Sequence, residues 1–255
     1  MSQSTRSSNS HAILLRIGCD SGKDGGKWNA PINTKTGEYA YVPIPGGESQ
    51  WNHICKCPTY AFFAAAVEAL GDKLPRHLAA STKCHLDPDF KELTHGESSP
   101  ETDKYSPRFQ AISELQEGDT IVFYASFRST NPRAKRLIYA LIGIFEIART
   151  RRVRELTRRE RKRYAHGRRV NSGGDLVFKA APKSSGRFSK AIIIPCNPGK
   201  SYRVPRKMAK AWGGLSRTWI QRSFRPPSFE NYSKFGAWLR RQRRRRGIRL
   251  LHTNV

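Results

Sequence analysis

Apolar stretches alternate with polar and glycine-rich stretches along most of the chain. Residues 11–18 form an apolar run that stops at an acidic turn, as a strand entering a core does. Residues 37–45 carry aromatic and β-branched residues up to two prolines, which predicts a second strand. The alanine-rich residues 57–80 predict a helix, with breaks at Gly71 and Pro75.

The later pattern predicts a sheet. Residues 113–127 indicate a short helix, a Gly-Asp turn and a strand, and residues 136–149 a buried strand paired with it. Strand character returns at 175–182 and 190–195, whereas residues 84–107 are acidic and rich in turns. We therefore expect an α+β fold, with one domain built on a mixed, bent β-sheet and carrying basic helical insertions.

The charge of the chain changes this picture most. The 255 residues include 47 Lys+Arg and 20 Asp+Glu, a formal net charge of +27. Such a charge attracts polyanions and releases their counterions on contact, so DNA is the expected partner and an anionic membrane surface the rival. No apolar run is long enough to cross a bilayer, and the five cysteines are odd in number and irregularly spaced. We expect a cytoplasmic protein in a reducing compartment, with no membrane contact.

Basic residues also divide the chain. We expect residues 1–10 to be a disordered lead, 11–239 to be one DNA-processing domain with a basic insertion at 149–169, and 240–255 to be an arginine-rich tail. Arginine binds phosphate bidentately, and these blocks predict affinity for DNA without sequence readout. The residues expected to contact DNA are Lys23, Lys27, Arg128, Arg133, Arg151, Arg152, Arg158, Arg159, Arg161, Arg163, Arg168, Arg169, Arg240, Arg241, Arg243 and Arg244.

Several familiar signatures are missing. There is no Walker loop, no dinucleotide-binding G-x-G-x-x-G after the first strand, and no zinc-finger or deaminase pattern. The segment "CHLDPDF" places Cys84, His85, Asp87 and Asp89 together, but its spacing fits no standard metal site. An Asx-type turn around Pro88 explains it better. We therefore expect no metal and no cofactor.

Asp20 is the first candidate for chemistry. It follows the first strand and opens the glycine-rich stretch "CDSGKDGGKWN". Asp20 either caps its own turn or holds a reactive carboxylate at a rigid strand end. A carboxylate in a cationic protein repels phosphate but stabilises the positive charge that develops on a sugar when an N-glycosidic bond breaks.

Several segments together resemble one known family. They are "RIGCDSGKDGGKWNAPI", "EYAYVPIP", "HLDPDF", "THGE", "LQEGDTIVFYASF" and "LIYALIGIFEI". In this order they resemble the nucleotide modification-associated domain family of bacteria and phages, in its third described type, over residues 12–200. The resemblance implies an α+β domain encoded beside enzymes that make or handle modified DNA bases. The arginine blocks at 149–169 and 240–249 look like additions to that pattern. The strand pair at 113–149 is also similar to that of PUA/EVE-type readers of modified bases.

The motif positions that the resemblance carries over are Asp20, Gly22, Gly26, Pro43, His85, Asp87, Asp89 and Gly118-Asp119. If they converge, they form an acidic pocket between basic walls, suited to an enzyme that acts on a flipped-out base.

The hypothesis is a DNA glycosylase that excises a hydroxymethylated or glucosylated cytosine from double-stranded phage DNA, with an anti-phage role. The expected catalytic residues are Asp20, Asp24, His85 and Asp87, and the expected base pocket is Gly22, Gly26, Trp28, Asn29, Tyr41 and Tyr124. The alternatives are a non-catalytic EVE-like reader of modified bases, an accessory enzyme of base modification, and an RNA-binding accessory protein.

Overall fold

The computed structural model of the chain describes residues 10–22, 25–46, 58–79, 81–100, 106–134, 136–195, 203–220 and 225–255. The strands are β1 (Ala12–Arg16), β2 (Pro31–Ile32), β3 (Ile44–Pro45), β4 (Cys84–His85), β5 (Thr94–Glu97), β6 (Thr120–Ser129), β7 (Leu137–Arg152), β8 (Leu176–Ala180), β9 (Gly186–Ile194) and β10 (Leu250–Leu251). The helices are α1 (Ala61–Glu68), α2 (Pro107–Ser113), α3 (Arg158–Arg163), α4 (Arg206–Ala211) and α5 (Tyr232–Arg246), with short 3-10 turns η3 (Arg76–Leu78), η4 (Val153–Glu155) and η5 (His166–Arg168).

The long apolar segments form one mixed sheet of eight strands. Its path runs β1-β6-β7-β8-β5; β9 also pairs with β7, β10 with β9, and β2 with β6. β1 lies parallel to β6, whereas β6, β7 and β8 follow one another antiparallel. The register of β6 and β7 shifts between Phe123 and Tyr124, which bends the sheet. The predicted α+β domain with a mixed sheet is confirmed.

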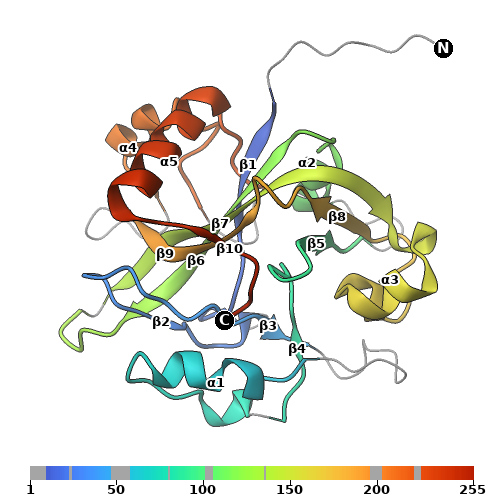
Figure 1. Cartoon of the computed structure of the whole chain (residues 1–255), viewed down its shortest axis with the longest axis horizontal. Helices are drawn as coiled ribbons and strands as arrows, with labels where there is room; N and C mark the ends of the chain where they lie inside the picture. Colours follow the sequence, from blue (N-terminus) through green and yellow to red (C-terminus); the bar gives the residue numbers. More distant parts are fainter. Residues whose placement is uncertain are drawn as a thin grey trace.

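Alternation along the strands divides the core between the two faces of the sheet. Leu15, Phe123 and Phe145 belong to the first core, which also holds Phe63 of α1. Leu14, Val122, Leu141, Trp212 and Phe235 belong to the second core, which packs against α4 and α5. Figure 1 shows α1 on one side of the sheet and α4 and α5 on the other.

Most long strands were predicted from their apolar pattern, and the differences have local causes. The segment 37–45 contributes only an isolated bridge at Tyr39 and the two-residue β3, because its prolines limit ladder hydrogen bonds. The helix expected from residue 113 instead ends there. α2 begins after Ser106, whose side chain accepts a hydrogen bond from the Phe109 N–H.

The arginine-rich residues 240–255 are part of the fold and not a separate tail. Residues 240–246 complete α5, which Phe235 and Leu239 anchor in the second core. Gly247, with φ 62°, ends the helix, and β10 then pairs with β9. The buried side chain of Asn254 attaches the residues after β10 to the first core, because it accepts a hydrogen bond from the Phe90 N–H and donates one to Asp89. No described helix is long and apolar enough to cross a membrane.

Candidate functional site

A cluster of histidines and aspartates lies beside the first core. His85 ends the short strand β4, Asp87 follows it, His95 lies in β5, and His166 opens η5. The ring of His95 packs edge-on against Phe123 and stacks over Phe178, both members of the first core. The cluster is nearly closed to solvent: the side chain of His85 is 13% exposed, that of Asp87 8%, and that of His166 4%.

Three ligand-type atoms meet in this cluster. His85 Nε2 lies 3.2 Å from His166 Nε2 and 3.8 Å from Asp87 Oδ2, and His166 Nε2 lies 3.4 Å from the same oxygen. The other oxygen, Asp87 Oδ1, accepts from the Gly96 N–H at 2.9 Å and lies 3.1 Å from His95 Nδ1. One face of the Asp87 carboxylate is thus fixed by β5, and the other faces the two imidazoles.

Asp175 holds His166 from behind. Its Oδ2 lies 2.8 Å from His166 Nδ1, and its Oδ1 accepts from the Ser99 N–H at 2.9 Å. A carboxylate on Nδ1 fixes the orientation of the ring and leaves Nε2 pointing into the cluster. His166 comes from the arginine-rich segment 149–169, so the fold joins this segment to residues more than seventy positions earlier in the chain.

Burial and neighbouring charges separate the pKa values of the cluster. Burial, reinforced by the nearby His166, lowers the pKa of His85 to about 3, so this imidazole is neutral at neutral pH. Burial opposes the charged form of His166 as well, but hydrogen bonds to Asp175 and Asp87 raise its pKa to about 9. Burial would raise the pKa of Asp87, yet the charge of His95 and the hydrogen bonds from His166 and His95 hold it well below its usual range.

The raised pKa of His166 predicts a specific dependence of the free energy of unfolding on pH. The contribution of His166 is complete below its ordinary pKa of 6.5 and is lost as pH rises towards about 9, because the folded chain retains a proton that the unfolded chain releases. Urea unfolding of the wild type and of His166→Gln between these pH values measures it. We expect the difference in the free energy of unfolding to shrink as pH rises; a constant difference would contradict the assignment.

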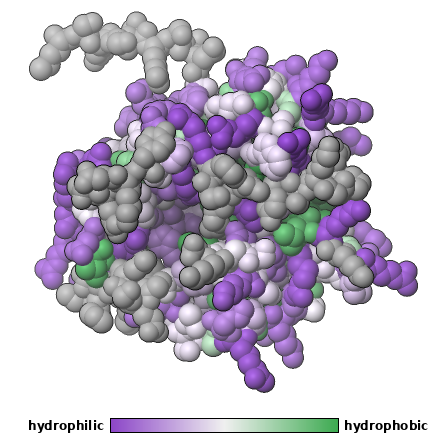
Figure 2. All heavy atoms as spheres, turned by 180° about the vertical axis from the view of Figure 1, so that it is seen from behind, coloured by the Kyte–Doolittle hydropathy of each residue, from purple (hydrophilic) through white to green (hydrophobic). Residues whose placement is uncertain are grey.

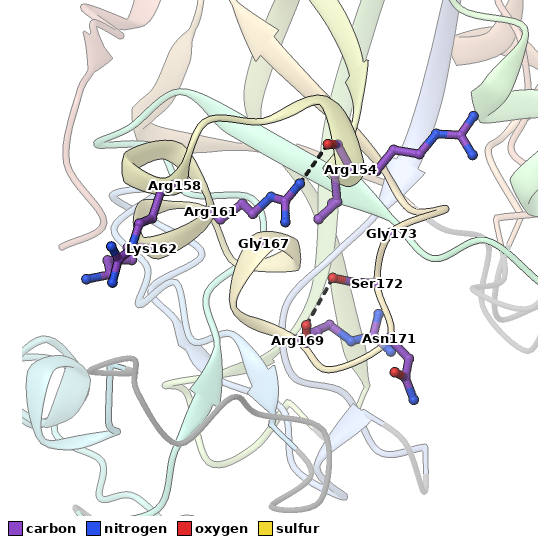
Figure 3. Close-up of a pocket in the computed structure, with 10 residues that line it drawn as sticks. Arg154, Arg158, Arg161, Lys162, Gly167, Arg169, Asn171, Ser172 and Gly173 are labelled. Atoms are coloured by element: carbon purple, nitrogen blue, oxygen red, sulfur yellow. Dashed lines mark hydrogen bonds between the residues drawn. The ribbon is translucent and has the colours of Figure 1, made fainter.

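A basic pocket lies next to the cluster. It encloses about 340 Å³ and is lined by Val153, Arg154, Arg158, Arg161, Lys162, Gly167, Arg169, Asn171, Ser172 and Gly173. Figure 3 shows that this single stretch of chain curls around the pocket, with a hydrogen bond from Arg161 to the carbonyl of Arg154 on one side and one from Ser172 to the carbonyl of Arg169 on the other. The lining contains five cationic side chains and no acidic one, so the pocket suits a phosphate group.

Asp175 connects this pocket to the cluster. Arg169, a lining residue, donates through a guanidinium nitrogen to Asp175 Oδ2 at 3.3 Å and also contacts Ser98. The same carboxylate oxygen holds His166. Asp175 thus links the basic pocket to the histidine that it orients.

Asp20 belongs to a different cluster. Its Oδ1 accepts from the Gly22 N–H at 2.7 Å, so the predicted cap of its own turn is confirmed. Its Oδ2 lies 3.4 Å from Arg16, whose guanidinium donates to Ser126 and lies over the ring of Tyr139. Tyr139 belongs to the second core, so Arg16 faces the side of the sheet opposite to His95. The convergence of Asp20 with the segment at 84–95 stays a prediction.

The residues expected to enclose a base are mostly core residues. Tyr41 is 2% exposed, lies in the first core and donates to the Pro88 carbonyl, whereas Tyr124 is 1% exposed and lies in the second core. They cannot line one pocket. Asn29 is also buried and donates to Ser126.

The remaining members of the expected pocket have separate settings. Gly22 is exposed and Gly26 is buried with φ 89°. Trp28 packs partly buried on the first core, as an aromatic in an apolar pattern commonly does. Asp24 and Lys23 lie outside the described residues.

The arginines expected to bind DNA fall into groups. Arg158, Arg161 and Arg169 line the basic pocket, and four lie on α5: Arg240, Arg241, Arg243 and Arg244. Others are held by carboxylates, as in the pairs Arg128–Asp72, Arg151–Glu160 and Arg163–Glu92. The rest include Lys27 in the glycine turn, Arg133 beyond β6, Arg152 at the end of β7, Arg159 on α3 and Arg168 in η5. Figure 2 shows that hydrophilic side chains dominate the described part of the face that it presents.

Comparison with known protein families identifies the chain. The model of nucleotide modification associated domain 3 matches residues 11–249. The protein belongs to this family. The matched range includes both arginine blocks, at 149–169 and 240–249. No curated protein and no solved structure matches the chain.

The sequence does not predict two residues that shape the cluster, His166 and Asp175. His166 lies within "RKRYAHGRR", where the arginines dominate the pattern. Its one signal is a histidine followed by a glycine inside that basic run. Asp89, in contrast, does form the expected Asx-type turn, since its Oδ1 accepts from the N–H groups of Lys91 and Glu92.

Proposed function

We propose that this family member is an enzyme that acts on a modified nucleotide in DNA, with its chemistry at the cluster of His85, Asp87 and His166. The basic pocket binds a backbone phosphate of the same strand. The observation that carries the proposal is the shared carboxylate: Asp175 contacts Arg169 of the pocket and His166 of the cluster. The membership of a nucleotide modification associated family and the net charge of +27 support it.

The most concrete reaction is hydrolysis of the N-glycosidic bond of a hydroxymethylated or glucosylated cytosine. Water adds to C1′ of the sugar, the bond from C1′ to the base breaks, and the proton from water ends on the freed base. Asp87 suits this reaction because its low pKa keeps it ionised, and a carboxylate stabilises the positive charge that develops on the sugar. Asp20 suits it less, since its two oxygens already accept from Gly22 and face Arg16.

A base-release assay tests the proposal. Duplexes with cytosine, hydroxymethylcytosine or glucosylated hydroxymethylcytosine are incubated with wild type, Asp87→Asn and Asp20→Asn, then examined for freed base by mass spectrometry and for strand breaks with and without alkali. We expect free base from one modified duplex only, alkali-dependent breaks, and loss of product in Asp87→Asn. Tight binding without freed base would favour a non-catalytic reader of modified bases. Strand breaks without alkali would show that the protein cleaves the DNA backbone and does not only excise a base.

The basic pocket has its own test. The double variant Arg158→Gln/Lys162→Gln removes two charges from the pocket, and Lys207→Gln/Lys210→Gln removes two charges from α4, outside it. We expect the first pair to weaken DNA binding and to lower the slope of log affinity against log salt by about 1 to 2. The α4 pair should leave product formation close to that of the wild type. If both double variants lost the same DNA affinity, the effect would come from net charge in general and not from the basic pocket.

A further inference from the structure

We infer that His85 Nε2, Asp87 Oδ2 and His166 Nε2 bind a divalent transition-metal ion, with Zn²⁺ as the first ion to test. These three ligand atoms lie within 4.8 Å of one another. Two imidazoles and one carboxylate form a donor set typical of catalytic zinc and of other first-row metals with open coordination positions. The sequence predicts no metal, because the spacing of Cys84, His85, Asp87 and Asp89 fits no standard site.

The distances fit an ion at the centre of the three atoms. The sides of the triangle are 3.2, 3.4 and 3.8 Å, so one point lies about 2.0 Å from all three atoms, which is close to the usual Zn–N and Zn–O distances. Two imidazole Nε2 atoms facing each other at 3.2 Å require either a shared proton or a cation between them. The ion takes the place of that proton.

The surrounding contacts orient the ligands in the way that metal sites require. Asp175 holds Nδ1 of His166 at 2.8 Å, an arrangement that fixes the tautomer with Nε2 free to bind metal. Gly96 and His95 engage Asp87 Oδ1 and leave Oδ2 for the ion. Among the described residues, nothing hydrogen-bonds to the buried His95 Nε2, so a further imidazole nitrogen lies close to the cluster without another partner.

Three protein ligands leave room for a water on the ion. His85 is the most exposed of the three side chains, so that position opens on its side of the cluster. A metal-bound water is a strong nucleophile at neutral pH, because the ion lowers its pKa. This role for the ion rests on the proposed function, whereas binding of the ion rests on the geometry alone.

Metal binding is tested without reference to catalysis, so that its failure is distinguishable from failure of the proposed reaction. Protein purified without a polyhistidine tag is dialysed against Zn²⁺ or Co²⁺ and then assayed for metal per chain. We expect one equivalent, and affinity at least about 100-fold weaker in His85→Gln. His77→Gln, a histidine that contacts the Gly26 carbonyl outside the cluster, is the matched control and should bind as the wild type does.

Two further measurements separate this site from unfolding of the variants and from metal held by a cysteine. Asp175→Asn keeps all three ligands and should weaken affinity about 10- to 100-fold, with unfolding curves showing that the variant is folded. The Co²⁺ protein should show ligand-field absorption without a thiolate charge-transfer band, because no cysteine is among the ligands. No stoichiometric metal, equal affinity in His85→Gln, or a thiolate band would each overturn the inference.

Discussion

The variant Gly96→Ala is expected to lose metal binding and product formation while it keeps its fold. A Cβ at residue 96 would lie 2.1 Å from Cδ2 and 2.8 Å from Nε2 of His166, closer than any van der Waals contact. The backbone of Gly96 is tied to β8 by strand pairing and to Asp87 by its N–H, so the imidazole must move instead. The methyl group therefore displaces one ligand without changing any group that takes part in chemistry.

The expected loss of metal affinity in Gly96→Ala follows from the displacement of one ligand, His166. Metal affinity should fall by at least about 100-fold, beyond the usual effect of an orienting residue. Overpacking should cost about 1–3 kcal/mol of unfolding free energy. Isothermal titration with Zn²⁺ and urea unfolding, performed on the same preparation, separate the two effects.

The matched control is Gly236→Ala in α5. Its Cβ would meet only a terminal nitrogen of Arg240, at 3.4 Å, and alanine favours a helix interior by about 0.5–1 kcal/mol over glycine. We expect this variant to be slightly more stable and to bind metal as the wild type does. If Gly96→Ala also bound Zn²⁺ with wild-type affinity, His166 could not be a ligand in the position that the structure gives it.

The sequence predicts the parts of the fold that have long, uniform apolar patterns. β1, β6 and β7 are long runs of alternating or buried apolar residues, so their sequence pattern alone identifies them as strands. β4 and β5 were missed, because they have two and four residues and carry the polar cluster in place of an apolar face. Their pairing depends on β3 and β8, which lie far away in the chain.

The sequence predicts only part of the candidate site. The residues of "HLDPDF" were singled out because they lie together, and their local turn at Asp89 follows from the sequence. The partners His166 and Asp175 come from a segment whose arginines indicate only phosphate binding. Conversely, Tyr41 and Tyr124 were assigned to a base pocket for their chemistry, although the apolar pattern around them predicts burial. Only the packing in the structure shows that Tyr41 and Tyr124 belong to different cores.

The ion pair of Arg16 and Asp20 gives the second large effect. Both side chains are 6% exposed, and the guanidinium also donates to Ser126 at 2.7 Å and covers Tyr139. Arg16→Met keeps most of the apolar stem but leaves the buried carboxylate without this cation. We expect the free energy of unfolding to fall by about 3–5 kcal/mol, measured by urea titration.

A comparison pair shows that the effect comes from burial. The Arg128–Asp72 pair lies at the surface, with the arginine side chain 53% exposed, so Arg128→Met should cost no more than about 1 kcal/mol. The double variant Arg16→Met/Asp20→Asn removes both charges and should recover part of the loss, with a coupling of about 1–3 kcal/mol. A loss below about 1 kcal/mol in Arg16→Met would show that Asp20 is not held as an ion by this pair.

The same variants decide what Asp20 does. If Asp20 serves the fold, Asp20→Asn lowers stability, and below its unfolding temperature it releases base at the wild-type rate per folded molecule. If Asp20 is catalytic, as expected from the sequence, product disappears in Asp20→Asn although the protein remains folded. Arg16→Met separates the cases further, because it keeps the carboxylate and removes only its cation. If Asp20→Asn were stable but inactive while Asp87→Asn stayed active, the reaction would take place at Asp20 and not at the cluster of His85, Asp87 and His166.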